Sequence, residues 1–386
     1  MKAVAVFPGA REIKIVEHGE PRLSSPTEVK LRVLEVGVCG TDKEICAFEY
    51  GTPPKDSPYL LLGHESLSEV VEAGAGVERL KRGDLVVASV RRPCPHASCV
   101  ACRMGRQDFC STGDFTERGI KERHGYLTEF VVDDEQYMTV LPPHLREVGV
   151  LIEPLTIAEK ALTQVWQVQQ RLPWWFAPGG GQAGQTPPPP PPAESAGGRE
   201  WLYHRAVVLG AGPVGLLGAM ALVVAGFDTH VYSREPAAGD RARLVEAFGG
   251  KYVSAETHGV EQLAEQVGGI DLVYEAAGAS GLSFEVMKHL DTNGVFVFTG
   301  VPGRKAPVAV DTDLLMRNLV LRNQAVFGTV NAGRDAFEAA VRDLEIFHPR
   351  WPEVVNSLIT SRLPVEGYRD LLLGKAGGIK NVFKLA

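Results

Sequence analysis

The chain has 386 residues, of which 45% are hydrophobic and 23% charged, and its formal net charge is −7. This length and apolar content predict two or three domains with proper hydrophobic cores. The acidic balance argues against a nucleic-acid partner, because phosphates attract clustered Lys and Arg. The first residues do not resemble a secretion signal, so we expect a cytoplasmic protein whose six cysteines are thiols or metal ligands rather than disulfides.

From Met1 to about Glu153 the sequence is rich in short β-like runs. Stretches such as "VKLRVLEVGVC" and "YLTEFVV" are separated by Gly, Pro and charged turns. This spacing is typical of a small, partly closed β-barrel with irregular insertions. We place this domain at residues 1–165. Residues 335–386 are expected to complete it, because "GGIKNVFKLA" reads as a strand that returns to the first domain.

Three dispersed motifs in this domain offer an open metal site. "GVCGTD" supplies Cys39 and Thr41, "LLGHES" supplies His64 and Glu65, and "LIEPL" supplies Glu153. A cysteine, a histidine and a carboxylate can hold zinc while leaving a fourth position for water or substrate. Each motif alone is weak evidence, since an isolated cysteine is usually an inert buried thiol. Together they predict a catalytic zinc ion.

Four further cysteines lie in "CPHASCVACRMGRQDFC", with the spacing C-x4-C-x2-C-x7-C. Four thiolates can enclose one zinc ion with no position left for substrate, which makes the site structural. The predicted ligands are Cys94, Cys99, Cys102 and Cys110. His96 is the alternative first ligand, because Cys3His sites also exist. The sixth thiol, Cys46, is expected to be buried and inert.

Residues 171–200 contain a glycine run and six consecutive prolines. We expect a mobile, partly polyproline insertion between domains, with a proline-recognition ligand as the alternative. Apolar strands then alternate with helical stretches over residues 201–334, which predicts a doubly wound parallel sheet and an α/β fold. The run from Ala206 to Phe227 is uncharged and long enough to cross a bilayer. Its glycine-rich break instead predicts a buried strand followed by a helix.

That break carries the motif G-x-G-x-x-G, which binds the pyrophosphate of a dinucleotide at a helix N-terminus. The predicted cofactor contacts are Gly210, Ala211, Gly212, Pro213, Val214 and Gly215. About 20 residues on, an NAD site normally has an acid for the ribose 2′-hydroxyl. Here Ser233 and Arg234 stand at the strand tip, so we expect NADP to be preferred, or both cofactors accepted. Glu235 comes one residue too late and is expected to be a solvated loop charge.

In this order, "GVCGTD", "GHE", the four-cysteine segment, "EPL" and G-x-G-x-x-G resemble the zinc-dependent medium-chain alcohol and polyol dehydrogenases. Within that group, the chain resembles the glucose 1-dehydrogenase branch known from archaea. The segments that carry this resemblance are "VRRPC", "TGDFTERGI" followed by "HGYLTEF", "LIEPLTIAEKAL" and "GTVNAG". The resemblance covers nearly the whole chain except the proline-rich insertion. It implies a GroES-like β-barrel catalytic domain and a Rossmann domain.

The resemblance also implies roles for single residues. Cys39, His64 and Glu65 would hold the catalytic zinc. The hydroxyl of Thr41 and the carboxylates of Glu117 and Glu153 would reach the sugar or zinc-bound water, although a salt bridge is the alternative role for Glu117. The nicotinamide would be bordered by the residues at two strand ends, namely Thr299, Gly300 and Val301, and Thr329, Val330 and Asn331. The side-chain amide of Asn331 would also lie near the sugar. The chain departs from some members at Ile157, where they carry a carboxylate, and in the longer first gap of the cysteine segment.

We therefore expect a zinc-dependent, NADP-preferring aldose 1-dehydrogenase that oxidises D-glucose to the 1,5-lactone, with galactose or xylose as further candidate substrates. Two alternatives remain open. One is a polyol or secondary-alcohol dehydrogenase on the same scaffold, and the other is a non-catalytic NADPH-binding protein. The expected partners are a small sugar and further copies of the same chain in a dimer or tetramer, with no nucleic acid and no membrane.

Overall fold

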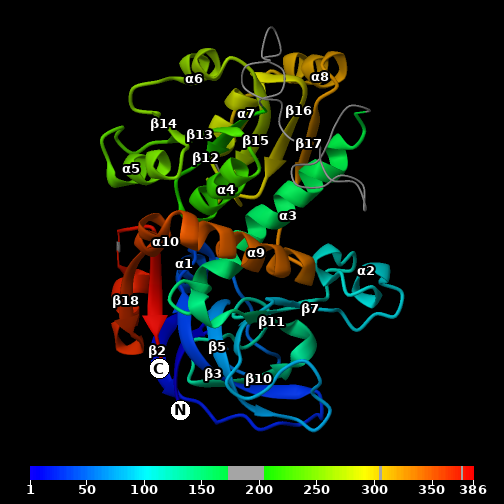
Figure 1. Cartoon of the computed structure of the whole chain (residues 1–386). Helices are drawn as coiled ribbons and strands as arrows, with labels where there is room; N and C mark the ends of the chain where they lie inside the picture. The colour runs from blue at the N-terminus through cyan, green and yellow to red at the C-terminus, as the bar shows by residue number, and fades with distance from the viewer. Residues whose placement is uncertain (173–203, 304–306, 375–376) are drawn as a thin grey trace. The chain divides into compact units, whose positions relative to one another are not determined.

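The structure is a computed structural model that describes residues 1–172, 204–303, 307–374 and 377–386 (Figure 1). It divides into two compact units. Unit 1 comprises residues 1–156 and 331–386, and unit 2 comprises residues 157–330. The sequence placed these junctions near residues 165 and 335. Apart from Arg171 and Leu172, the proline-rich insertion lies outside the described residues.

Unit 1 is built on antiparallel strands. Its largest sheet has the order β11-β6-β5-β3-β19-β18, with β10 also paired to β3. The strands of this sheet are β3 (Glu28–Gly37), β5 (Glu65–Ala73), β6 (Leu85–Ala88), β10 (Phe130–Asp134), β11 (Met138–Leu141), β18 (Ile359–Pro364) and β19 (Lys380–Lys384). Two smaller sheets comprise β1 (Lys2–Phe7), β2 (Glu12–Glu17) and β4 (Leu60–Leu61), and β7 (Arg91–Arg92), β8 (Thr116–Arg118) and β9 (Glu122–Arg123).

The strand β19 joins distant parts of unit 1. It pairs antiparallel with residues 35–37 of β3 and parallel with β18. Figure 1 shows this red strand beside the blue strands of the N-terminal region. The helices of this unit are α1 (Gly40–Cys46), α2 (Val100–Arg103), α9 (Arg334–Arg350), α10 (Pro352–Leu358) and the first turns of α3 (Ile152–Gln169), which continues into unit 2.

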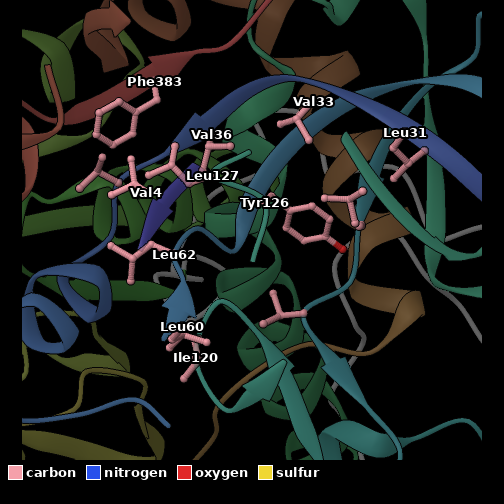
Figure 2. Close-up of a cluster of buried hydrophobic side chains, with 14 of the residues drawn as sticks. Val4, Leu31, Val33, Val36, Leu60, Leu62, Ile120, Tyr126, Leu127 and Phe383 are labelled. Carbon is pink, nitrogen blue, oxygen red and sulfur yellow. The ribbon is translucent and has the colours of Figure 1, made fainter. Parts of the chain in front are cut away.

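The core of unit 1 forms where alternate side chains of several strands meet. Val4, Leu31, Val36 and Phe383 are each at most 1% exposed, and they come from β1, β3 and β19. Figure 2 shows these side chains converging with Tyr126 and neighbours from the loops. The intervening β1 residues Ala3 and Ala5 are buried in another cluster with Leu61, so both faces of this strand are covered.

Unit 2 is a six-stranded sheet in the order β14-β13-β12-β15-β16-β17, with every neighbouring pair parallel. This confirms the predicted doubly wound α/β architecture. The strands are β12 (Arg205–Leu209), β13 (Asp228–Ser233), β14 (Lys251–Ser254), β15 (Ile270–Glu275), β16 (Leu290–Phe298) and β17 (Ala325–Gly328). They alternate with α4 (Pro213–Val224), α5 (Asp240–Ala247), α6 (Val260–Val267), α7 (Ser280–Met287) and α8 (Thr312–Leu321) (Figure 1).

The uncharged run from Ala206 to Phe227 is divided between two elements. Its first part is β12, and its second part is α4, which begins at Pro213 after the glycine-rich turn. Apolar residues around the whole helix are expected where it is covered on several sides. Within the described ranges, no helix combines the length and the apolar character needed to span a bilayer.

Candidate active site

The four cysteines of the predicted structural site converge. The Sγ atoms of Cys94, Cys99, Cys102 and Cys110 all lie within 4.8 Å of one another. The sulfurs of Cys99 and Cys110 are 3.9 Å apart, far beyond a disulfide bond. Zinc–sulfur bonds of about 2.3 Å in a tetrahedron would put neighbouring sulfurs about 3.8 Å apart. The cluster therefore fits a zinc ion with four protein ligands.

His96 is engaged elsewhere. Its Nε2 atom pairs with the carboxylate of Asp114, and the ring is 45% exposed. The alternative first ligand thus lies outside the group of converging atoms, which contains Cys94 instead. Cys46 is buried, and burial raises the pKa of its thiol to about 12, so it remains protonated at neutral pH.

A second group of ligand atoms forms at the N-terminus of α1 and the start of β5. One atom each of Cys39, His64 and Glu65 lies within 4.8 Å of the other two. Cys39 is the residue before the first turn of α1, and its backbone N–H donates to the Asp42 carboxylate at 2.9 Å. The Thr41 hydroxyl lies 3.9 Å from the Cys39 sulfur. A thiolate, an imidazole and a carboxylate fit a three-ligand zinc site.

Asp42 is a residue of this site that the sequence reading missed. Its Oδ1 atom lies 3.5 Å from Nδ1 of His64, and both side chains are almost completely buried. Burial disfavours the charged imidazole, but the Asp42 carboxylate outweighs it and raises the pKa of His64 well above its ordinary value. The same negative charge would favour a metal ion on the other ring nitrogen and hold the ring in place.

Glu65 is held by a buried lysine. Lys380 Nζ donates to both carboxylate oxygens at 2.7 and 2.6 Å, and to the carbonyl of Val38 at 3.2 Å. Opposite Glu65 on β3 stands Gly37, where a Cβ atom would lie 2.1 Å from Glu65 Oε2. A side chain at position 37 would displace the Glu65 carboxylate from this place. The strand pairing and the lysine thus aim Glu65 at the Cys39–His64 pair.

Glu153 lies in the first turn of α3 and is buried. Burial raises the pKa of Glu153 to about 7. The positive charges of His64 and Lys380 oppose this rise, while the negative charge of Glu65 adds to it. These electrostatic interactions place Glu153 close to the ligand group.

The carboxylate of Glu117 is fixed by two donors on one oxygen. Arg91 Nε and Asn331 Nδ2 both lie 3.0 Å from Oε1. The Arg91 guanidinium also stacks on the Phe115 ring, 3.6 Å from its centre. Asn331 adopts a left-handed backbone (φ 61°), and its Oδ1 accepts from the N–H of Ala332 at 2.9 Å. Sequence reading offered a salt bridge as the alternative role of Glu117. The bridge exists, to Arg91, and both this bond and the one from Asn331 fall on Oε1.

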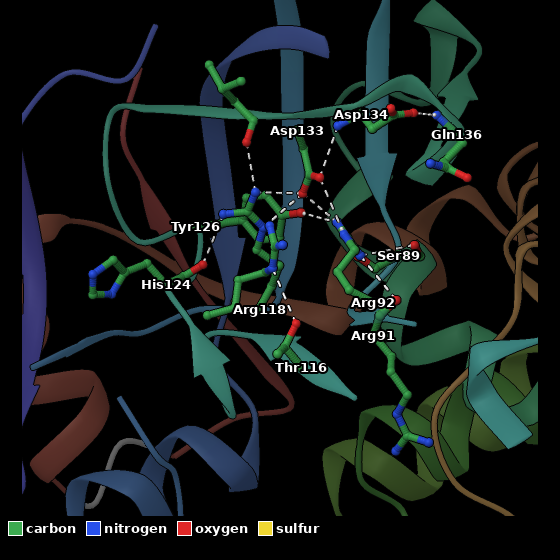
Figure 3. Close-up of polar contacts among 12 residues, drawn as sticks. Ser89, Arg91, Arg92, Thr116, Arg118, His124, Tyr126, Asp133, Asp134 and Gln136 are labelled. Carbon is green, nitrogen blue, oxygen red and sulfur yellow. Dashed lines mark hydrogen bonds and ion pairs between the residues drawn. The ribbon is translucent and has the colours of Figure 1, made fainter. Parts of the chain in front are cut away.

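A second ion-pair network holds the strands that carry this pair. Arg92 and Arg118, the neighbours of Arg91 and Glu117, both bond to the buried carboxylate of Asp133 (Figure 3). Burial would raise the pKa of Asp133, but the two arginines hold it well below its usual range. Because successive strand residues face opposite sides, Arg91 points away from this network in Figure 3. Its Nε atom donates to Glu117 instead.

The glycine-rich turn of unit 2 has the geometry of a dinucleotide fingerprint. Gly210 adopts φ 102°, and a Cβ atom at Gly215 would lie 2.0 Å from the carbonyl oxygen of Gly210. Gly212 precedes the first residue of α4, Pro213. This arrangement brings the turn close to the helix N-terminus, where backbone N–H groups can receive a pyrophosphate.

Glu275, at the end of β15, is another residue that sequence reading missed. Its buried carboxylate accepts from the backbone N–H groups of Ala277, Gly278 and Gly300 at 2.8, 2.7 and 3.1 Å. The Thr299 hydroxyl donates to the Glu275 carbonyl at 2.7 Å. One side chain therefore shapes the predicted nicotinamide loop at residues 299–301.

The second predicted nicotinamide segment is held from α3. Gln164 Nε2 donates to the Thr329 hydroxyl at 2.6 Å, and Lys160 Nζ donates to the Val330 carbonyl at 3.0 Å. At the tip of β13, the side chain of Arg234 is exposed. Glu235 differs from the expectation of a solvated charge, because its carboxylate bonds to the Ser233 hydroxyl and to Arg241. The turn after β13 brings the side chain back to the strand.

Comparisons with known proteins agree with this geometry. The family described as "Alcohol dehydrogenase GroES-like domain" matches residues 25–143, and "Glucose dehydrogenase C-terminus" matches residues 193–385. The chain is 36% identical to a glucose 1-dehydrogenase of Methanocella arvoryzae, over 98% of each chain. It is also 36% identical to that of Thermoproteus tenax, over 100% of this chain and 99% of the other.

A solved structure is similar along the whole length. It is the Haloferax mediterranei glucose dehydrogenase in complex with NADP, Zn and gluconolactone, at 29% identity and a TM-score of 0.84, covering 100% of this chain and 99% of that one. The fold is the one predicted, with a GroES-like domain and a parallel Rossmann sheet. On its two family matches and its full-length relatives, the chain belongs to the glucose 1-dehydrogenase branch of the zinc-dependent medium-chain dehydrogenases.

Proposed function

We propose that this chain oxidises D-glucose at C1 to the 1,5-lactone, with hydride transfer to NADP. The family membership supports the reaction class. The observation that supports a sugar as the substrate is the position of the Glu117 carboxylate, which two donors hold in place. Arg91 and Asn331 both donate to Oε1 at 3.0 Å, so we expect Oε2 to accept from a sugar hydroxyl. An oriented charged acceptor discriminates a polyhydroxylated ring from an apolar alcohol.

We assign zinc to two places. The structural ion would be held by the four cysteines, and the catalytic ion by Cys39, His64 and Glu65. Zinc at the second place would act as a Lewis acid on the C1 hydroxyl. The Haloferax relative, whose structure contains Zn and gluconolactone, supports this assignment.

The chain's own residues then orient the sugar and move its proton. The Thr41 hydroxyl, 3.9 Å from the Cys39 sulfur, can accept the proton of the C1 hydroxyl and donate its own outward. Glu117 and Asn331 hold the sugar ring by hydrogen bonds. Glu153, whose pKa burial raises to about 7, can exchange protons near neutral pH. Overall, glucose and NADP⁺ give the lactone, NADPH and one proton.

For the cofactor we propose the fingerprint turn at residues 210–215 as the pyrophosphate site and the loops at 299–301 and 329–331 as the border of the nicotinamide. Ser233 and Arg234 would contact the adenosine ribose. The support is the geometry of the turn, the family membership and the NADP bound by the Haloferax relative. Hydride transfer itself is the chemistry of the nicotinamide.

We further propose a homo-oligomer in the cytoplasm. An exposed apolar row on α8, formed by Met316, Val320 and Leu321, lies in the unit whose sheet ends at the edge strand β17. Such patches commonly mark subunit interfaces. All six cysteines are unpaired, which fits a reducing compartment.

The first experiment is an initial-rate measurement at 340 nm with D-glucose, comparing NADP with NAD on zinc-replete protein. We expect NADP reduction that stops when chelator removes the catalytic zinc. Activity on sorbitol or threonine, but not on glucose, would replace the sugar assignment with a polyol or secondary alcohol. Binding of NADPH without turnover on any substrate would leave a non-catalytic protein.

A further inference from the structure

The end of β13 carries a compact polar group, two members of which, Glu235 and Arg241, have no role in the proposed function. Ser233 Oγ donates to Oε2 of Glu235, and Arg241 Nη1 lies 2.7 Å from Oε1 of the same carboxylate. The Glu235 backbone carbonyl accepts from the hydroxyls of Tyr252 and Ser254 at 2.9 and 2.8 Å. This carboxylate is therefore held in one place rather than free in solvent.

Arg241 connects the group to the nucleotide turn. Its Nη1 atom donates to the carbonyl of Ala211, inside the G-x-G-x-x-G motif, at 2.9 Å. The N–H of Gly210, in the same turn, donates to the carbonyl of Tyr232 at 2.9 Å, near the end of β13. The turn and the strand end thus form one corner of unit 2, and Glu235 and Arg241 lie in it.

In a doubly wound sheet this corner receives the adenosine ribose, because the second strand ends beside the pyrophosphate turn. An acid there accepts the ribose 2′-hydroxyl of NAD, whereas an arginine pairs with the 2′-phosphate of NADP. In this chain an acid and an arginine, Glu235 and Arg241, are in contact at this corner. Both remain accessible to a ligand, since the side chains of Glu235 and Arg241 are 37% and 26% exposed.

We infer that Glu235 and Arg241 together select the cofactor. Glu235 favours NAD, and it binds Ser233 and Arg241, the two side chains that the 2′-phosphate of NADP would need. For NAD, the Glu235 carboxylate accepts the 2′-hydroxyl while it stays paired with Arg241. For NADP, the 2′-phosphate takes Arg241 and the Ser233 hydroxyl, and Glu235 must turn away. The chain therefore accepts both cofactors, and Glu235 reduces its affinity for NADP. This inference rests on the dinucleotide site of the proposed function, but not on the sugar.

The charges of Glu235 and Arg241 support these opposite effects on NAD and NADP. Burial would raise the pKa of Glu235, but the Ser233 hydrogen bond and the positive charge of Arg241 hold it below its ordinary value. Glu235 is therefore ionised at neutral pH. A 2′-phosphate, with a charge of about −1.5 to −2, would be repelled by this carboxylate and attracted by Arg241. A neutral 2′-hydroxyl meets no such repulsion.

The test measures binding of the adenosine half alone to the full chain by calorimetry, with adenosine 2′,5′-bisphosphate and 5′-AMP as ligands. Glu235→Gln should tighten the bisphosphate about tenfold, the size of one hydrogen bond to a charged group, and should not tighten AMP. Arg241→Gln should weaken the bisphosphate about tenfold and AMP much less. Arg243→Gln is the matched control, because Arg243 lies on the same helix and pairs on the surface with Asp240.

Thermal unfolding of each variant shows whether it remains folded. An unchanged ratio of the two dissociation constants in folded Glu235→Gln would overturn the inference while leaving the dinucleotide site intact. Failure of the wild type to bind either ligand would overturn the dinucleotide site as well. Absence of glucose oxidation would affect neither result, because no sugar is present.

Discussion

Lys380 in β19 places its ammonium 2.7 and 2.6 Å from the two oxygens of Glu65 in β5, and both side chains are at most 2% exposed. The two residues are 315 positions apart in the sequence. A buried pair of this kind offsets the desolvation of each charge only while the other is present. Removing one partner leaves an uncompensated charge in the interior.

Lys380→Met should therefore lower the free energy of unfolding by about 3–5 kcal/mol. The comparison is Lys251→Met, which breaks a surface pair with Asp228 and should change it by less than about 1 kcal/mol. Urea unfolding of both variants measures the difference. Equal, small changes would mean that the Lys380–Glu65 pair does not stabilise unit 1.

The two ligand groups predict separable zinc ions. Metal analysis of the purified wild type should give about two zinc ions per chain, one for each complete ligand set. Cys110→Ser should lose one and lower the thermal unfolding midpoint, because a structural site contributes folding energy. Cys39→Ser should lose the other together with dehydrogenase activity. Cys46→Ala is the control and should keep both ions, and full zinc content in Cys110→Ser would contradict the four-cysteine site.

Glu117→Gln tests the sugar contact. The amide loses the charge that a sugar hydroxyl would bind, so KM for glucose should rise about tenfold or more, while KM for NADP stays unchanged. Glu122→Gln is the matched control, because Glu122 stands opposite Glu117 in the β8–β9 register. Steady-state kinetics with each substrate varied separately would distinguish the two. A similar rise in both variants would indicate a general disturbance of these strands.

His124 predicts a specific loss of stability in acid. Burial lowers the pKa of His124 to about 4, aided by the charges of His18 and Arg118, and its Nδ1 accepts from the N–H of Leu61 at 3.2 Å. The unfolded value is about 6.5, so the unfolded state takes up the proton first. The contribution of the neutral ring is therefore complete above about pH 6.5 and is lost as pH falls toward about 4.

His124→Asn keeps an oxygen that can accept the Leu61 N–H but removes the titration. Its unfolding midpoint should fall less than that of the wild type between about pH 6.5 and 4. The exposed His144, which pairs with Glu345 on the surface, gives the control His144→Asn. Parallel curves for His124→Asn and wild type would show that His124 does not set the acid response.

The apolar row on α8 predicts self-association. Val320 and Leu321 are 70% and 65% exposed in the single chain. Replacing both with Lys should shift the molar mass measured by light scattering toward the monomer, because charged residues are disfavoured inside an interface. Val140→Lys, at an exposed apolar position of unit 1, should leave the mass unchanged. An oligomer that survives the double change must use another surface.

Local motifs were predictable from the sequence because their residues are close along the chain. The four cysteines and the glycines at 210–215 constrain their own loops, so spacing alone indicates the chemistry. The partners of site residues were not predictable in this way. Lys380 reaches Glu65, and Asn331 reaches Glu117, only after distant strands and loops have come together.

Glu235 shows a different reason for a missed residue. Counting from the motif placed it beyond the strand tip, and the following Pro236 suggested a turn into solvent. Counting takes the backbone as extended, whereas a turn here directs the side chain back to Ser233. Spacing rules therefore indicate the proposed ribose corner only to within about two residues, and the contacts show that the Glu235 side chain lies beside Ser233 and Arg241.

The position of β19 has a consequence for biosynthesis. Residues 35–37 of β3 obtain their partner on one edge only when β19 is available, and the whole of unit 2 lies between these segments in the sequence. At about 5–20 residues per second, the ribosome needs roughly 20 to 70 seconds to pass from one to the other. During that interval unit 2 can fold on the nascent chain. Unit 1 meanwhile retains an open sheet edge and a Glu65 carboxylate without its lysine, so we expect the Cys39–His64–Glu65 site to be completed only after β19 is translated.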